Sequence, residues 1–135
     1  MRLIITQFRV LLLSLFLLVG SINDVFSQNI LDNAGLNKPS SLAYSLRKLS
    51  STYNGFAVQV RRSSDNALAN VSFDANGVVS VNSTIDGTST SFQSFIGSNS
   101  CYIQTWYDQS GNNRHATQTN TSKQPMIVNA GVFTL

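Results

Sequence analysis

Carboxyl groups are the first candidates for chemistry in this sequence, because paired carboxyl groups are common general acids and bases. The chain has six acidic residues, all of them aspartates, and no glutamate. Beyond residue 27 they are Asp32, Asp65, Asp74, Asp86 and Asp108. The last four have Asn, Ser or Gly within two positions, which is typical of turns, where the Asp side chain bonds nearby backbone. We therefore predict turn-forming carboxylates and assign no catalytic residue.

The single histidine, His115, follows a loop that contains Asp108 and Asn112. A metal site requires several ligands, and this set is too small for zinc. The loop also lacks the acidic residue that a calcium-binding loop has at its twelfth position. We predict a surface or packing histidine, no metal site and no cofactor. The single cysteine, Cys101, cannot form an internal disulfide and is expected to be buried as a small apolar side chain.

Residues 102–107 combine aromatic and β-branched side chains, which is typical of a strand. Strict alternation would put Cys101, Ile103 and Tyr107 on one face. Tyr102 and Trp106 would then occupy the other face. Bulk on both faces predicts a strand inside a sandwich. The three aromatic side chains could form a stacking platform for sugars, but aliphatic neighbours on both faces favour the core.

Further elements are predicted on both sides of this strand. Apolar residues recur at helical spacing from Leu42 to Tyr53, so an amphipathic helix is expected over residues 42–53. A strand over 56–60 and a turn at 63–66 follow. Asn76-Gly77 is a hairpin signal between a short strand near Val71 and another over 78–81. A loop over 82–90, a helical turn at 92–96 and a strand from Met126 complete an all-β pattern.

The two ends of the chain have distinctive compositions. Arg2 and Arg9 both precede a short apolar run over residues 10–20. Val25 and Ser27 then fit the −3 and −1 positions of a cleavage site before Gln28. This pattern is typical of a secretory signal peptide over residues 1–27 and is short for a membrane anchor. We expect a secreted or cell-surface protein. Because residues 132–135 are largely apolar, we expect the chain to stop within a domain.

Three segments resemble a known family: Ala43–Arg62, Ser63–Asn66 and Trp106–Asn112. Together they are similar to the N-terminal part of the alpha-L-arabinofuranosidase B-type catalytic domain. The resemblance implies a mostly β fold, an incomplete concanavalin-like jelly-roll sandwich over residues 42–135, preceded by one amphipathic helix and a lead-in over 28–41. It also implies removal of arabinofuranosyl groups from plant polysaccharides. The family's catalytic carboxylates lie in the second half of its domain, so no residue here inherits that role, and no carbohydrate-binding residue is assigned.

Charge and resemblance leave three functional hypotheses. Residues 28–135 have seven basic and five acidic side chains, a net charge of +2, with only short basic doublets, so we expect no nucleic-acid partner. The first hypothesis is the N-terminal part of a secreted arabinofuranosidase-like enzyme that is inactive alone. The alternatives are a lectin-like glycan-binding module of the same fold, and an adhesive domain that binds no sugar. The expected partner is a plant-type polysaccharide or another glycan.

The first testable prediction concerns export. If residues 1–27 form a signal peptide, the exported protein begins at or near Gln28, because signal peptidase cleaves after small residues such as Ser27. N-terminal sequencing of the secreted product measures this directly. Recovery of the intact N-terminus in a membrane fraction would contradict the prediction.

Overall fold

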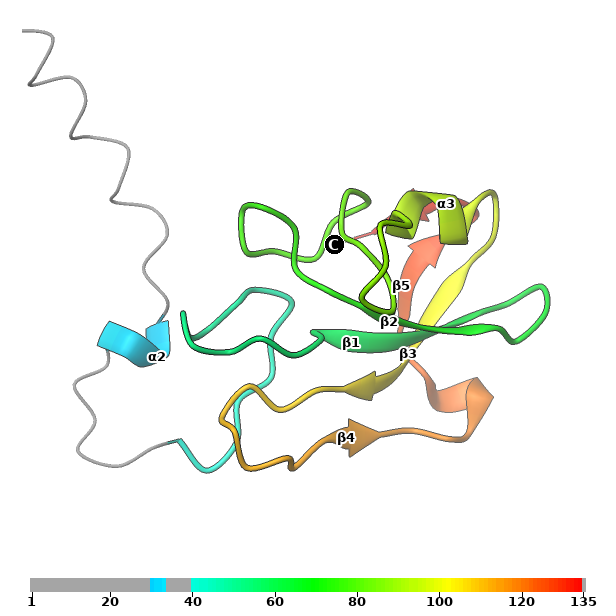
Figure 1. Cartoon of the computed structure of the whole chain (residues 1–135). Helices are drawn as coiled ribbons and strands as arrows, with labels where there is room; N and C mark the ends of the chain where they lie inside the picture. The colour runs from blue at the N-terminus through cyan, green and yellow to red at the C-terminus, as the bar shows by residue number, and fades with distance from the viewer. Residues whose placement is uncertain (1–29, 34–39, 135) are drawn as a thin grey trace, which may run out of the picture.

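A computed structural model describes residues 30–33 and 40–134 of the 135-residue chain. The predicted signal peptide and most of the lead-in lie outside these residues. The described residues form two short α-helices, one 3₁₀ helix and six strands, in this order: α2 (Ile30–Asn33), β1 (Val58–Arg62), β2 (Leu68–Val71), α3 (Phe92–Ile96), β3 (Cys101–Trp106), β4 (Ala116–Thr117), η1 (Thr121–Lys123), β5 (Met126–Asn129) and β6 (Val132–Phe133) (Figure 1). In this described part, no helix is long and apolar enough to cross a bilayer.

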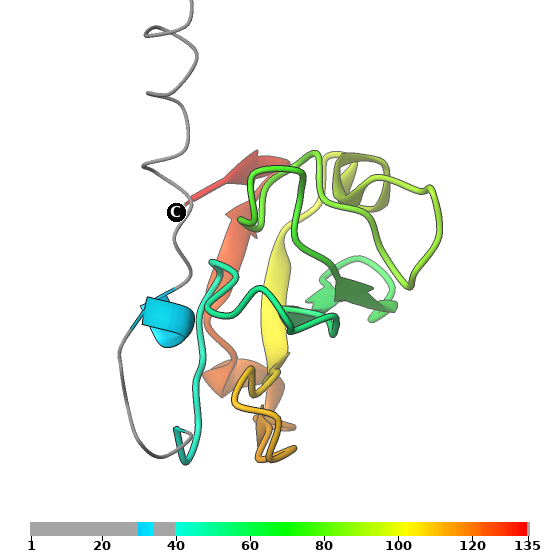
Figure 2. The ribbon, with the colours of Figure 1, turned by 60° about the vertical axis from the view of Figure 1, so that its left-hand side comes forward.

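The six strands form one antiparallel sheet. The strand order is β2-β1-β3-β5-β6, and β4 pairs with the C-terminal end of β3, at Thr105 and Trp106. The strands twist strongly, so the sheet curls rather than lying flat (Figure 2). This mostly β architecture with few helices confirms the predicted fold class and is consistent with an incomplete jelly roll. The strands predicted near Val58, Val71, Ile103 and Met126 are all present.

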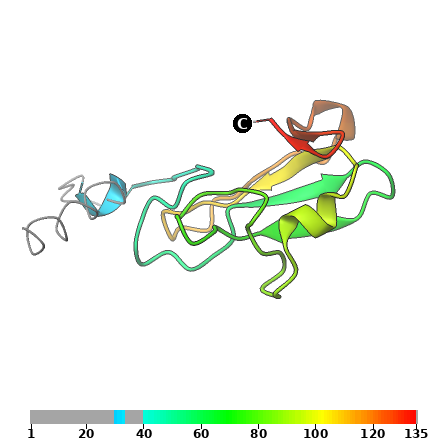
Figure 3. The same ribbon diagram turned by 90° about the horizontal axis from the view of Figure 1, so that it is seen from above.

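The hydrophobic core lies on one face of this sheet. α3 and the long connection between β2 and α3 lie over that face (Figure 3). Ser91 caps the start of α3 by accepting a hydrogen bond from the Ser94 amide, and Gly97 ends the helix at a φ of 55°. The helix thereby directs Phe92 and Ile96, both fully buried, into the core. The core cluster is Ala57, Val58, Val60, Ala69, Val71, Val79, Ile85, Phe92, Ile96, Cys101, Ile103, Ile127 and Val128.

A β-bulge in β3 corrects the predicted faces of that strand. Gln59 pairs with Thr105, but the next residue, Val60, pairs with Ile103, so Gln104 is an extra residue on β3. Because one extra residue reverses the alternation beyond it, Trp106 pairs with Val58 and packs against the core. The prediction that Trp106 faces away from Ile103 is therefore wrong. The core assignment holds for Trp106, and Cys101 is fully buried as predicted.

The amphipathic helix predicted over residues 42–53 is not formed. The backbone of this segment instead bonds to residues about sixty positions away. The Gln109 amide side chain donates to the carbonyls of Ser45 and Arg47, each at 3.0 Å, and accepts from the Leu49 amide at 2.8 Å. The Gln109 backbone amide also donates to the Ala43 carbonyl at 2.7 Å. These bonds replace the helical ladder, so the apolar spacing misled the prediction.

The turn at Asn76-Gly77 is confirmed, whereas the strand predicted after it is not. Gly77 has a φ of 70°, and its amide donates to the Asp74 carbonyl at 3.0 Å. Val78 makes only an isolated bridge to Arg47, and residues 79–81 belong to no strand. The chain turns again because the buried Ser83 side chain accepts a hydrogen bond from the Ser80 amide at 3.0 Å.

The second testable prediction concerns the Gln109 side chain. Gln109→Glu keeps the shape but cannot donate to the Ser45 and Arg47 carbonyls, and it adds a charge at a position that is 3% exposed. We expect the free energy of unfolding to fall by about 3 kcal/mol, measured by urea denaturation.

Gln93→Glu on the exposed surface of α3 is the matched control for Gln109→Glu. This substitution should change the free energy of unfolding by less than about 0.5 kcal/mol. Equal stability of the two variants would show that Gln109 does not hold residues 43–49.

Candidate functional site

Asp108 lies directly after β3, and its carboxylate holds the following loop. The side chain is 1% exposed and accepts four hydrogen bonds. The donors are the Ala43 amide at 2.8 Å, the Ser110 amide at 2.9 Å, the Ser110 hydroxyl at 2.8 Å and the Arg114 amide at 3.1 Å. Burial raises the pKa of Asp108, but these bonds outweigh it and lower the pKa to about 2. The carboxylate is ionised and fully occupied in shaping the loop.

The carboxylates of the other three predicted turn residues also accept hydrogen bonds within the protein. Asp65 forms a bidentate ion pair with Arg62, and the hydrogen bonds from Arg62 and the Ala67 amide lower the pKa of Asp65 to about 2. Asp74 accepts from the amides of residues 76 and 78 and from the Ser80 hydroxyl. Asp86, at a φ of 53°, accepts from both the backbone and side-chain amides of Asn70. The predicted turn-forming role is confirmed for Asp65, Asp74 and Asp108. Asp86 lies in a turn, but its carboxylate bonds Asn70 on β2 instead of the backbone of that turn.

His115 packs on the surface of the same loop that Asp108 holds. Its Nδ1 accepts a hydrogen bond from the Asp108 backbone amide at 3.1 Å, and its ring meets the Tyr107 ring edge-on at 5.0 Å between centroids. The residue is exposed, as expected for a surface or packing histidine. Within the described residues, no group of three or more His, Cys, Asp or Glu side chains could hold a metal ion.

The sheet face opposite the core has a row of amide side chains across three neighbouring strands. We define this amide row as Gln104 on β3, Gln59 on β1 and Asn70 on β2. Gln104 donates to Gln59 at 3.3 Å, and Gln59 donates to Asn70 at 3.1 Å. The Asn70 amide then donates to the Asp86 carboxylate at 3.0 Å. All three amides are half-buried, so part of each remains accessible to a ligand.

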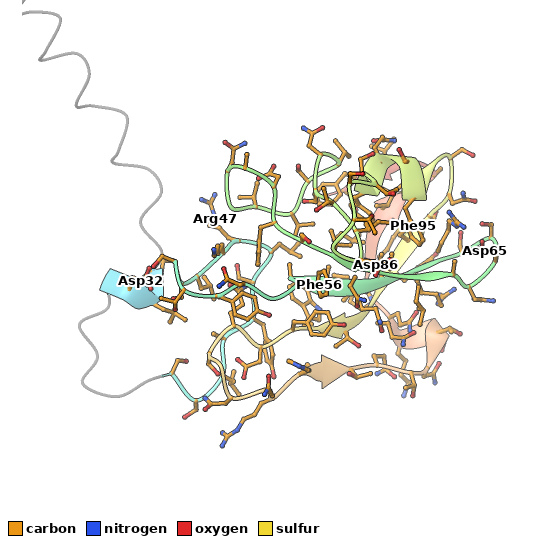
Figure 4. All side chains as sticks on the ribbon, viewed as in Figure 1. Asp32, Arg47, Phe56, Asp65, Asp86 and Phe95 are labelled. Atoms are coloured by element: carbon orange, nitrogen blue, oxygen red, sulfur yellow. The ribbon has the colours of Figure 1, made fainter. Side chains whose placement is uncertain are left out.

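Aromatic side chains lie on the same face as the amide row. The Tyr107 hydroxyl donates to the Asn70 side-chain oxygen at 2.5 Å, and the Tyr107 ring lies 6.2 Å from that of Phe56. Burial, and then the nearby charge of Asp86, raise the pKa of Tyr107. On the same strand as Gln104, the ring of Tyr102 has its centre 5.1 Å from the Arg61 guanidinium. Figure 4 labels Phe56 near the start of β1 and Asp86 beside β1 and β2.

We call this arrangement, the amide row with Tyr107, Phe56 and Tyr102, the polar face. Fixed amide groups can bond the hydroxyl groups of a ligand, and aromatic rings on the same face can pack against its apolar surface. The sequence favoured the core for Tyr102 and Tyr107, and for these two residues that prediction is wrong, because both lie on this half-exposed face outside the core cluster. Sequence reasoning missed the amide row, although Gln59 and Asn70 alternate with buried neighbours in their strands.

The model of the family described as alpha-L-arabinofuranosidase B, catalytic, matches residues 31–131. No curated protein and no solved structure matches significantly. The matched range contains the Asp108 loop and every residue of the polar face.

The third testable prediction concerns the Asp108 carboxylate. Its pKa in the folded protein lies below the ordinary value of 3.8, so its contribution to stability is complete above about pH 4 and declines as the pH falls toward 2. Asp108→Asn replaces an acceptor oxygen with a donor and should cost about 2 kcal/mol at pH 7. Thermal unfolding at a series of pH values should show the difference from the unsubstituted chain shrinking below pH 4. A difference that stays constant down to pH 2 would contradict the assignment.

Proposed function

The chain belongs to the family of the alpha-L-arabinofuranosidase B catalytic domain, and we propose that it acts in a secreted protein on arabinose-bearing glycans. The family match over residues 31–131 supports the substrate class. The basic and apolar pattern of residues 1–27 supports export to the compartment where such polysaccharides are found. The nearly balanced charge of residues 28–135 fits a neutral polymer better than nucleic acid.

The role proposed for this chain is glycan binding without cleavage. Hydrolysis of a glycosidic bond normally needs two carboxyl groups, one as acid and one as nucleophile or base. The chain has no glutamate, and the carboxylates of Asp65, Asp74, Asp86 and Asp108 are occupied by hydrogen bonds within the protein. A carboxylate held at a pKa of about 2, as that of Asp108 is, makes a poor general acid near neutral pH. We therefore infer that the chain alone does not release arabinose.

The observation that supports binding is the amide row. Each sugar hydroxyl both donates and accepts hydrogen bonds, and an amide offers a donor and an acceptor on adjacent atoms. The row repeats these groups at the spacing of neighbouring strands, about 5 Å. That spacing is comparable to the length of one sugar unit. Tyr107, which bonds Asn70, and Tyr102, on the same strand as Gln104, then supply apolar surface on the same face.

The fourth testable prediction separates binding from hydrolysis. The full chain should release no measurable product from a chromogenic arabinofuranoside, yet bind an arabinan oligosaccharide in calorimetry. Gln59→Leu removes the central amide of the row and should weaken this binding about tenfold, because the ligand loses hydrogen bonds at that position.

Gln93→Leu, on the exposed surface of α3, is the matched control and should leave binding unchanged. Release of arabinose that disappears in a folded Asp108→Asn variant would instead make Asp108 catalytic. Equal binding by Gln59→Leu and the unsubstituted chain would remove the amide row from the proposed function.

A further inference from the structure

A hollow of about 340 Å³ lies beside the polar face, where the chain leaves β2. Its walls include three aromatic residues, Tyr53, Phe56 and Phe73, and the polar residues Asn54 and Ser72. This volume is near the lower limit for ligand pockets in proteins, so the hollow suits a small ring rather than a long chain.

The aromatic walls of this hollow are fixed by contacts within the protein. The rings of Tyr53 and Phe73 meet edge-on at 6.3 Å between centroids, and the Tyr53 hydroxyl donates to the Phe56 carbonyl at 2.8 Å. Gly55 permits this arrangement, because a Cβ there would lie 2.4 Å from the Tyr53 hydroxyl. The rings are therefore held in place before any ligand enters, which reduces the entropic cost of binding.

Two polar side chains of the hollow have no partner within the described part of the chain. The Ser72 hydroxyl and the Asn54 amide make no side-chain hydrogen bond there, whereas the Asp74 carboxylate is occupied by residues 76, 78 and 80. The charged residues of the hollow, Lys48 and Asp74, have opposite signs. A neutral ligand with hydroxyl groups fits this combination better than an anion or a cation does.

Phe56 connects the hollow with the polar face. Phe56, labelled in Figure 4, lines the hollow, and its ring lies 6.2 Å from that of Tyr107, whose hydroxyl bonds Asn70 of the amide row. We propose that the hollow is a separate subsite for one neutral sugar ring, a branch of the glycan whose backbone lies along the polar face. This inference rests on the proposed function, because it takes the polar face as the site of the backbone.

The fifth testable prediction compares a linear arabino-oligosaccharide with the same oligosaccharide bearing single-ring branches. In calorimetry with the full chain, the branched ligand should bind more tightly than the linear one. The double variant Asn54→Ala, Ser72→Ala should lose about tenfold in affinity for the branched ligand and less than twofold for the linear one. Chemical-shift changes on adding methyl arabinofuranoside should include Tyr53 and Phe73.

Two controls distinguish failure of the subsite from failure of the proposed function. Ser64→Ala, at an exposed serine of the turn between β1 and β2, should leave both affinities unchanged. Gln59→Leu should weaken both ligands together. Equal affinity of the unsubstituted chain for the two ligands, or an equal loss for both in the double variant, would overturn the subsite and leave the polar face standing. No binding of either ligand by the unsubstituted chain would overturn both.

Discussion

Two adjacent side chains after β3 attach residues 43–49 to the sheet, and the site depends on this attachment. Asp108 binds the Ala43 amide and closes its own loop, while Gln109 binds backbone groups from Ser45 to Leu49. Both side chains are buried, and within the described residues every buried side-chain nitrogen or oxygen has a partner. Because residues 43–49 lead directly to Tyr53, the same attachment positions one wall of the hollow.

The bulge at Gln104 determines which aromatic side chains are available to a ligand. Without the extra residue, Trp106 would lie on the polar face and Tyr107 in the core. With the extra residue, Trp106 pairs with Val58 on the core side of the sheet. The Tyr107 hydroxyl then donates a hydrogen bond to Asn70 on β2. The bulge also keeps Gln104 within 3.3 Å of Gln59, so one irregularity both completes the amide row and adds an aromatic ring to its end.

Local patterns predicted what local interactions determine. Four strands, the turn at Gly77, the helical turn of α3 and three turn-forming aspartates follow from residue type and short spacing, whereas the strand predicted over 78–81 does not form. The prediction of a helix over residues 42–53 was wrong, because Gln109, sixty residues from Leu49, forms hydrogen bonds that compete with those of a helix. The amide row could not be predicted either, since it requires the register of β1 with β2 and β3, including the bulge. The family resemblance was predicted correctly because its motif Trp106–Asn112 is continuous in sequence.

The burial of Cys101 makes its rate of chemical modification a measure of how often the sheet opens. This thiol is fully buried between β1 and β5, and burial raises its pKa to about 11, so almost none of it is thiolate at neutral pH. An alkylating reagent can therefore react only after the centre of the sheet has opened. The rate of modification of this single cysteine reports how often β1 and β5 separate from β3, and a ligand that bridges these strands would slow it.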